Sequence, residues 1–321
     1  MPLSRAELES AEIMVRSAMA PTPCYPWPLL SARVGTEVWL KHENTAPTGA
    51  FKVRGGLVYL ARLKAARPEC RGVVAATRGN HGQSIAFAAT RHGLSATVVA
   101  PQGNSPGKNR AMRALGAELI EHGHDFQAAF EHAHAISDER RLTFIPSFHP
   151  DLVAGVASYA LELFRSAGPL DAVYVPIGLG SGICGVMAAR DALGLTTEVI
   201  GVVSTEAPAY ALSFDAKRSI STNSANTLAD GMACRVPVAE AVDQILTGAS
   251  RIVRVSDEEI LEAIGALFDD CHTLAEGAGA APLAALMQER GRMAGKRVAL
   301  IVSGGNIDGP LFRRALDRAR A

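Results

Sequence analysis

The chain has 321 residues, of which 48% are hydrophobic and 20% charged, a composition typical of globular rather than disordered proteins. Its 32 lysines and arginines balance its 32 aspartates and glutamates, so no basic excess is available to bind nucleic acid or an anionic membrane surface. The five cysteines include no CxxC pair, which predicts reduced thiols in a cytoplasmic protein.

The predicted elements alternate between strands and helices along the chain. The N-terminal MPLSRAELESAEIMVRSAM has helical apolar spacing and lacks the apolar core of a signal peptide. Helices are then expected to begin near Lys52, Asn80 and Pro106. Strands are predicted at EVWLK (37–41), GVVAA (72–76), ATVVAP (96–101), AELIEHG (117–123), DAVYVPI (171–177), EVIGVVS (198–204) and RVALIVS (297–303). Because these apolar runs are continuous, we expect parallel strands that are covered on both faces.

The Pro-containing segment FIPSFHPDLVAG (144–155) is the best candidate for a crossing between two lobes. We therefore predict an α/β protein with a small α/β domain at 65–149. Residues 1–64 and 150–321 are expected to form the larger domain.

Four glycine-rich loops follow predicted strands, and each contains polar residues that a covered sheet does not need. They are KHENTAPTGAFKVRGG (41–56), ATRGNHGQS (76–84), PIGLGSGICG (176–185) and VSGGNIDG (302–309). Any one of them alone is compatible with an ordinary turn, and a lone lysine is usually solvated. Four such loops at strand ends predict a binding site at the carboxyl edge of a parallel sheet.

The third loop suits an anion, because its glycines let backbone N–H groups converge at the start of a helix. A phosphate is the expected guest. Segment 180–185 also matches the dinucleotide fingerprint G-x-G-x-x-G, with Glu206 placed to hold a ribose. The alternative is therefore an NAD(P)-dependent oxidoreductase, which leaves Lys52 and the remaining loops unexplained.

The stretches PTGAFKVRGG and RGNHGQSIAFAA resemble the pyridoxal-phosphate (PLP) enzymes of the tryptophan synthase β-type fold, fold type II. Within that fold they resemble the serine/threonine dehydratase and serine racemase branch, and the resemblance covers residues 20 to 310. It implies a two-lobed fold with parallel-rich twisted sheets covered by helices, a PLP cofactor and an imine formed by Lys52. It further implies cofactor contacts from Phe51, Asn80, Gly178, Leu179, Gly180, Ser181, Gly182 and Ser303, and a substrate loop of Thr77, Arg78, Gly79, Asn80 and His81.

The activity implied by this resemblance is that of a lyase in amino-acid catabolism. It removes water from a β-hydroxy amino acid of the threonine or serine type and releases a 2-oxo acid and ammonia. Lys52 would remove the α-proton, and burial beside Phe51 would lower the pKa of its amine. Ser303 would meet the pyridine nitrogen without a compensating charge, which suits elimination better than transamination. An amino acid, as a small-molecule substrate, is the expected partner, and a homodimer is the expected assembly.

Arg78 departs from the family pattern, where the corresponding residue is small and is a serine base in racemases. A guanidinium is effectively always protonated, so efficient racemisation is not expected. Three interpretations stay open: Arg78 points outward and pairs with protein acids, it binds the second carboxylate of 3-hydroxyaspartate, or its stem lines an apolar pocket for phenylserine. A hydroxyectoine-derived compound is a further alternative substrate.

No metal is expected, because Leu212 stands where the family's cation site has an aspartate six residues after Glu206. We interpret His122, His124, His132 and His134 as exposed helical side chains. The chain stops at Ala321, so no regulatory domain of the biosynthetic threonine enzymes is expected.

Overall fold

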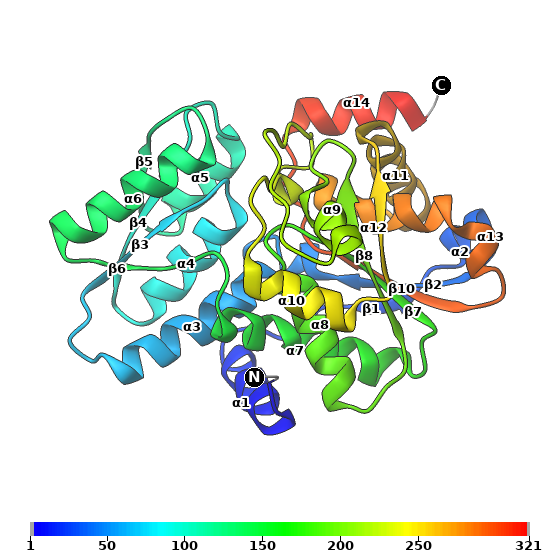
Figure 1. The fold of residues 1–321 in the computed structure, drawn as a ribbon, viewed down its shortest axis with the longest axis horizontal. Coiled ribbons are helices and arrows are strands. Elements are labelled where there is room, and N and C mark those ends of the chain that lie inside the picture. The colour runs from blue at the N-terminus through cyan, green and yellow to red at the C-terminus, as the bar shows by residue number, and fades with distance from the viewer. Residues whose placement is uncertain (1–2, 320–321) are drawn as a thin grey trace.

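Two parallel-rich sheets form the framework of the computed structural model, which describes residues 3–319 (Figure 1). The strands are β1 (Cys24–Pro26), β2 (Glu37–His42), β3 (Gly72–Ala76), β4 (Ser95–Ala100), β5 (Ala117–Glu121), β6 (Thr143–Phe144), β7 (Ala172–Pro176), β8 (Glu198–Ser204), β9 (Arg251–Val255) and β10 (Arg297–Val302). Six of them form a sheet in the order β1-β2-β10-β7-β8-β9, and four form a second sheet in the order β5-β4-β3-β6. The β1–β2 pair is antiparallel, and the other pairs are parallel.

Helices cover the faces of both sheets. They are α1 (Arg5–Arg16), α2 (Pro28–Val34), α3 (Lys52–Ala66), α4 (Asn80–Arg91), α5 (Pro106–Ala114), α6 (Phe126–Arg140), α7 (Pro150–Ala167), α8 (Ser181–Ala192), α9 (Ala209–Ala216), α10 (Ala239–Gly248), α11 (Asp257–Cys271), α12 (Gly277–Gln288), α13 (Arg290–Met293) and α14 (Gly309–Ala319), with 3-10 turns η1 (Glu43–Thr45) and η2 (Asp230–Met232).

The small sheet shows why its strands have continuous apolar sequences. Val73 and Ala75 belong to a core with α3 and α4, whereas Val74 and Ala76 pack against α6. Successive side chains of a strand point to opposite faces, so a strand covered on both sides needs an apolar residue at every position. The large sheet is built in the same way, with α11 and α12 on one face and α7 and α8 on the other.

The predicted fold class is confirmed, and each of the seven predicted strands is present. Three strands were not predicted: β1, β6 and β9. The strands of the small sheet fall within residues 72–144, and the domain bounds at 65 and 149 stay a prediction.

The carboxyl ends of the central strands meet at one edge of the large sheet. Val302 pairs with His42, and Leu300 pairs with Tyr174, so β2, β10 and β7 end side by side. The loops after these strands include Lys52, Ser303 and Gly178. In the small sheet, β3 ends at Ala76 and leads through a short loop into α4, which begins at Asn80.

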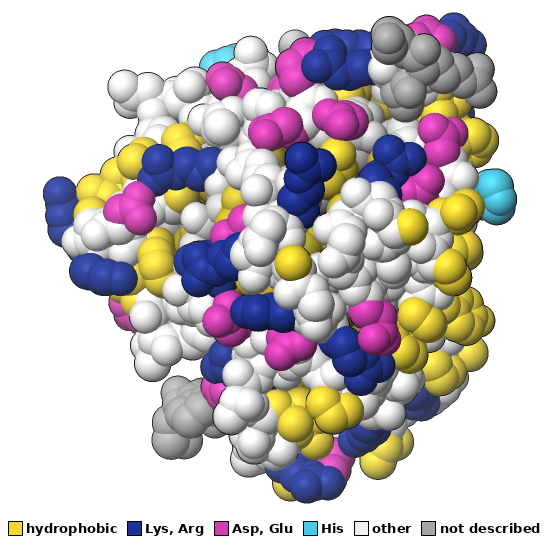
Figure 2. Space-filling view, turned by 90° about the vertical axis from the view of Figure 1, so that its right-hand side faces the viewer, with side chains coloured by type: hydrophobic (Ala, Val, Ile, Leu, Met, Phe, Trp, Pro, Cys, Tyr) yellow, Lys and Arg dark blue, Asp and Glu magenta, His cyan; other side chains and the backbone are white. Residues whose placement is uncertain are grey.

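The distribution of charged side chains on the surface agrees with the balanced net charge of the chain. Figure 2 shows acidic and basic side chains interspersed over one face, with no large area of a single sign. Among residues 3–319 no helix combines the length and apolarity that crossing a membrane requires.

The prediction that all four paired histidines are helical was wrong for His122 and His124, which lie in the loop between β5 and α6.

Candidate active site

A cavity of about 730 Å³ lies where the four glycine-rich loops meet. The predicted site residues lie together there although they come from four distant segments. Those that line the cavity are Phe51, Lys52, Thr77, Arg78, Gly79, Asn80, His81, Gly178, Leu179, Gly180, Ser181, Gly182 and Ser303. The structure thus brings together every predicted site residue, whereas their individual roles stay predictions.

Lys52 is the first residue of α3, and its amine faces the cavity. Its Nζ lies 3.0 Å from Ser181 Oγ and 5.0 Å from the centre of the Phe51 ring. Burial lowers the pKa of Lys52 to about 8. The N-termini of α3 and α8 act in the same direction, because the positive end of a helix dipole disfavours an ammonium. No acidic side chain within the described residues forms an ion pair with Lys52.

The glycine loop leads from β7 into α8. Gly180 caps the helix with a φ of 98°, a left-handed conformation that favours glycine. A Cβ on Gly178 would lie 2.3 Å from the carbonyl oxygen of Gly231, so a side chain has no room there. The first N–H groups of a helix have no partner within it, and together with the helix dipole they form an anion-binding site.

The loop after β3 is held by Thr77. Its Oγ1 accepts hydrogen bonds from the backbone N–H of Gly79 (2.9 Å) and of Gly82 (3.2 Å). Asn80 begins α4, with its Nδ2 donating to Glu276 Oε1 at 2.5 Å. Burial, with the nearby charge of Lys52, lowers the pKa of His81 to about 3, so its imidazole is neutral.

Ser303 follows β10 and is 3% exposed. Its carbonyl oxygen accepts a hydrogen bond from the backbone N–H of Phe51 at 3.0 Å, and Ala50 forms a β-bridge with Gly304. The segment preceding Lys52 is therefore tied directly to the end of β10.

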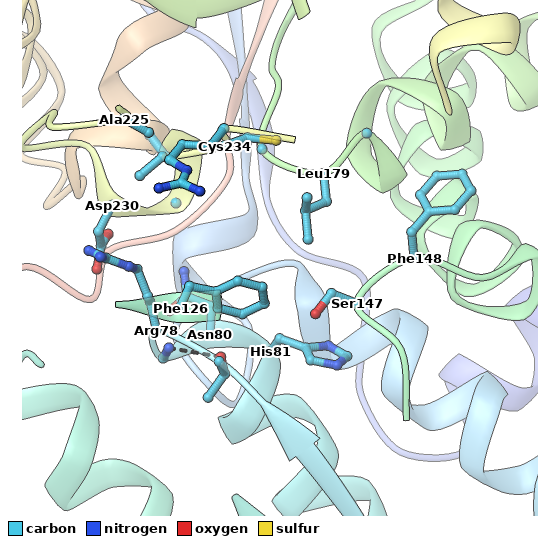
Figure 3. Close-up of a pocket in the computed structure, with 18 of the residues that line it drawn as sticks. Arg78, Asn80, His81, Phe126, Ser147, Phe148, Leu179, Ala225, Asp230 and Cys234 are labelled. Atoms are coloured by element: carbon cyan, nitrogen blue, oxygen red, sulfur yellow. Dashed lines mark hydrogen bonds between the residues drawn. The ribbon is translucent and has the colours of Figure 1, made fainter. Parts of the chain in front are cut away.

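Arg78 is half-buried and lines the cavity. In the described part of the chain it forms no ion pair or side-chain hydrogen bond, so the interpretation that it pairs outward with protein acids was wrong. Figure 3 shows Arg78 and Asp230 toward one side of the cavity, with Ser147 and Phe148 toward the other. The guanidinium of Arg78 is thus available to a ligand in the cavity.

Sequence analysis missed three charged residues of the cavity wall. Lys108 Nζ lies 2.6 Å from Asp230 Oδ2 and 3.0 Å from Glu276 Oε2. Burial raises the pKa of Glu276, an effect that Lys108 opposes. Glu276 stands in the Gly/Ala-rich segment LAEGAGAAPLAAL (274–286), which assigns it no role, and no local pattern singles out Lys108 or Asp230.

These residues fit PLP. The chain offers an amine of lowered pKa, a helix N-terminus for a phosphate, and amide and hydroxyl groups on the same cavity. The class that the fold and the site define is an α/β enzyme that binds a phosphorylated aldehyde through a lysine. Across residues 3–319 no group of three His, Cys, Asp or Glu side chains is placed to hold a metal ion.

Comparison with known proteins agrees with this class of enzyme. A family model described as "Pyridoxal-phosphate dependent enzyme" matches residues 15–304. The L-threonine ammonia-lyase of Thermotoga maritima is 35% identical over 291 residues, 90% of this chain and 72% of that protein. The L-threo-3-hydroxyaspartate ammonia-lyase of Pseudomonas sp. is 32% identical, over 89% of this chain and 90% of that protein. The crystal structure of a threonine deaminase from T.th. superimposes with a TM-score of 0.89 at 32% identity, covering 95% of this chain and 99% of that one.

The chain belongs to the pyridoxal-phosphate dependent enzyme family. The predicted cofactor and the predicted class, a PLP-dependent lyase that acts on hydroxy amino acids, are confirmed by these relatives. The family assignment replaces the alternative of an NAD(P)-dependent oxidoreductase.

Proposed function

We propose that this chain removes water from a β-hydroxy amino acid of the threonine or serine type and releases a 2-oxo acid and ammonia. The observation that carries the proposal is Lys52: its amine faces the cavity beside the N-terminus of α8, and its pKa is lowered to about 8. Near pH 7 about a tenth of an amine with this pKa is neutral, far more than for an ordinary lysine, and this neutral form can accept a proton.

PLP, when bound, supplies an aldehyde for the substrate amine and an electron sink for the α-carbon. The N-terminus of α8, with Ser181, would hold its phosphate. Asn80 would contact the ring hydroxyl and Ser303 the ring nitrogen. Lys52 Nζ would take the proton from the substrate α-carbon, and Ser181 Oγ, at 3.0 Å, would orient the amine.

The second candidate substrate is 3-hydroxyaspartate, and Arg78 is the observation that favours it. A half-buried guanidinium on the cavity wall, without a carboxylate partner among the described residues, suits a second substrate carboxylate. A Pseudomonas relative with this substrate in its name aligns over most of the chain. Phe126, Phe130 and Phe148 also line the cavity, which keeps phenylserine as an alternative.

The first experiment tests the cofactor and the lysine. Protein supplied with PLP is expected to absorb at about 410–420 nm, and Lys52→Ala is expected to lose this absorbance together with turnover. Survival of either property in Lys52→Ala would contradict the role of Lys52.

The second experiment distinguishes between the candidate substrates. Release of 2-oxo acid is measured from serine, threonine, 3-hydroxyaspartate and phenylserine, with Arg78→Met compared with the control Arg91→Met, an exposed arginine of the same loop-and-helix segment. If the acidic substrate is correct, Arg78→Met lowers kcat/KM for 3-hydroxyaspartate by about 10- to 100-fold, because a charge-assisted hydrogen bond is lost. Equal losses for threonine and 3-hydroxyaspartate would reject this role of Arg78.

Two further proposals concern the cellular compartment and the oligomeric state of the enzyme. All five cysteines are free in the structure, which supports placement in the reducing cytoplasm. We keep the homodimer as a proposal that sedimentation of the purified protein would test.

A further inference from the structure

Glu276 is buried in the cavity wall at the N-cap of α12 and is 3% exposed. Its backbone N–H donates to the carbonyl oxygen of Gly304 at 3.0 Å, next to Ser303. Its Oε1 accepts from Asn80 Nδ2 at 2.5 Å, and its Oε2 lies 3.0 Å from Lys108 Nζ. A carboxylate this deeply buried needs partners. Among the described residues Oε1 accepts the hydrogen bond from Asn80, whereas Oε2 accepts none and has the Lys108 ammonium as its ion-pair partner.

Lys108 holds Glu276 in place and is itself held from two sides. It is 6% exposed, and its second carboxylate partner is Asp230, at 2.6 Å. Its stem packs over Gly79, where a Cβ would lie 2.3 Å from Lys108 Cδ. Lys108 and Asn80 come from helices of the small sheet, whereas Glu276 and Asp230 come from the segments around the large sheet.

The side-chain amide of Asn80 has a defined orientation as a result. Its oxygen accepts from Asn306 Nδ2 at 2.9 Å, and one of its two N–H groups is used by Glu276. A flipped amide would place an oxygen against the Glu276 carboxylate, which is repulsive. The orientation observed leaves one Asn80 N–H group free for a ligand in the cavity.

We propose that Glu276 is a positioning residue of the cofactor site: through its contacts with Asn80 and Lys108 it orients the Asn80 amide toward the PLP ring hydroxyl across the junction of the two sheets. This inference rests on the proposed role of Asn80 toward PLP. It does not depend on which amino acid is the substrate.

The experiment compares Glu276→Ala and Glu276→Gln with Glu289→Gln, a control glutamate that pairs with Arg251 and Tyr174 outside the cavity. Full-length protein is stripped of cofactor and titrated with PLP without any amino acid. The dissociation constant for PLP, the absorbance maximum of the bound cofactor and the Tm of the cofactor-free protein are measured.

Glu276→Ala is expected to weaken PLP binding by about 10-fold and to shift the absorbance maximum, because the Asn80 amide then keeps only its hydrogen bond from Asn306. Glu276→Gln retains an oxygen for Asn80 and is expected to lose about 3-fold or less. Glu289→Gln is expected to leave both PLP readings unchanged, whatever its effect on Tm.

Wild-type affinity and an unchanged absorbance maximum in Glu276→Ala would overturn the inference, as would equal losses in Glu276→Ala and Glu289→Gln. If Glu276→Ala does not fold, Lys108→Met provides the test, since it removes the cation that holds Glu276 but leaves Asn80 intact. PLP binding by Lys108→Met with wild-type affinity and absorbance would then reject the proposal. If the wild-type protein binds PLP but releases no 2-oxo acid, the proposed function is contradicted, whereas the role of Glu276 in PLP binding is not.

Discussion

The amine of Lys52 destabilises the cofactor-free protein, and replacing it with methionine is expected to raise stability. Burial lowers the pKa of Lys52 from the usual 10.5 to about 8. This difference corresponds to about 3 kcal/mol of unfavourable free energy for the buried ammonium. Because the side chain faces the cavity, where water screens its charge, we take this figure as an upper value.

The pH dependence follows from proton binding in the two states. Between about pH 8 and pH 10.5 the unfolded chain binds a proton at Lys52 that the folded chain has lost, so wild-type stability rises with pH in this range. Below about pH 8 both states are protonated and the full cost is present. The gain from Lys52→Met is therefore expected to be greatest at neutral pH and to vanish near pH 10.5.

The assay is urea unfolding of cofactor-free protein at pH 7.0 and at pH 10.5. At pH 7.0, Lys52→Met is expected to gain up to about 3 kcal/mol, or about 4 °C in Tm for a chain of this length. Lys296→Met, outside the cavity, serves as the control and is expected to change little. A Lys52→Met protein that is less stable than wild type at pH 7.0, or equally stabilised at both pH values, would refute the reasoning.

Three other changes test the framework around the site. Gly180→Ala adds a Cβ at a φ of 98° and 2.6 Å from Ala241 Cβ, and is expected to weaken PLP binding about 10-fold in a titration; unchanged affinity would contradict the anion-binding loop. Arg54→Met leaves Lys41 as the one buried cation beside two buried carboxylates, Glu43 and Glu162. It is expected to cost about 3–5 kcal/mol in urea unfolding, against less than about 1 kcal/mol for the exposed Arg5→Met. Burial raises the pKa of Cys184 to about 12, so iodoacetamide at pH 8 is expected to leave it unmodified in the native protein and to label it in urea. Labelling is measured by mass spectrometry, and labelling of the native protein would contradict the burial of Cys184.

The sequence predicted central strands better than edge strands, for a physical reason. A strand covered on both faces is apolar at every position, as in β3, and is easy to recognise. By contrast, β9 lies at the edge of the large sheet, and its sequence RIVRV begins with one arginine and has a second between two valines. The two- and three-residue strands β6 and β1 are too short to show any period.

The same distinction applies to the site. Lys52, Asn80 and the glycine loop stand in local motifs, so their presence at one cavity was predictable. Glu276 is 196 residues away from Asn80 in the sequence, and Asp230 is 122 residues away from Lys108. Contacts at such separations depend on how the two sheets face each other, which no local pattern contains. The direction of the Arg78 side chain was open for the same reason.

The start of α3 shows how the protein holds an unpaired amine in place. Residues two apart on a helix point in different directions, so Lys52 faces the cavity while Arg54 faces the interior. There Arg54 lies 2.7 Å from both Glu43 and Glu162, and Lys41 lies 2.5 Å from Glu162. These two cations and two anions balance in charge.

Because the interior ion pairs fix the first turn of α3, Lys52 needs no ion pair of its own to be oriented. An acidic partner beside Lys52 would hold it as an ammonium and raise its pKa, which would suppress attack on an aldehyde. The anchoring cation and the reactive amine are therefore separate residues on one helical turn. It follows that loss of Arg54 should weaken PLP binding as well as stability, even though Arg54 does not line the cavity.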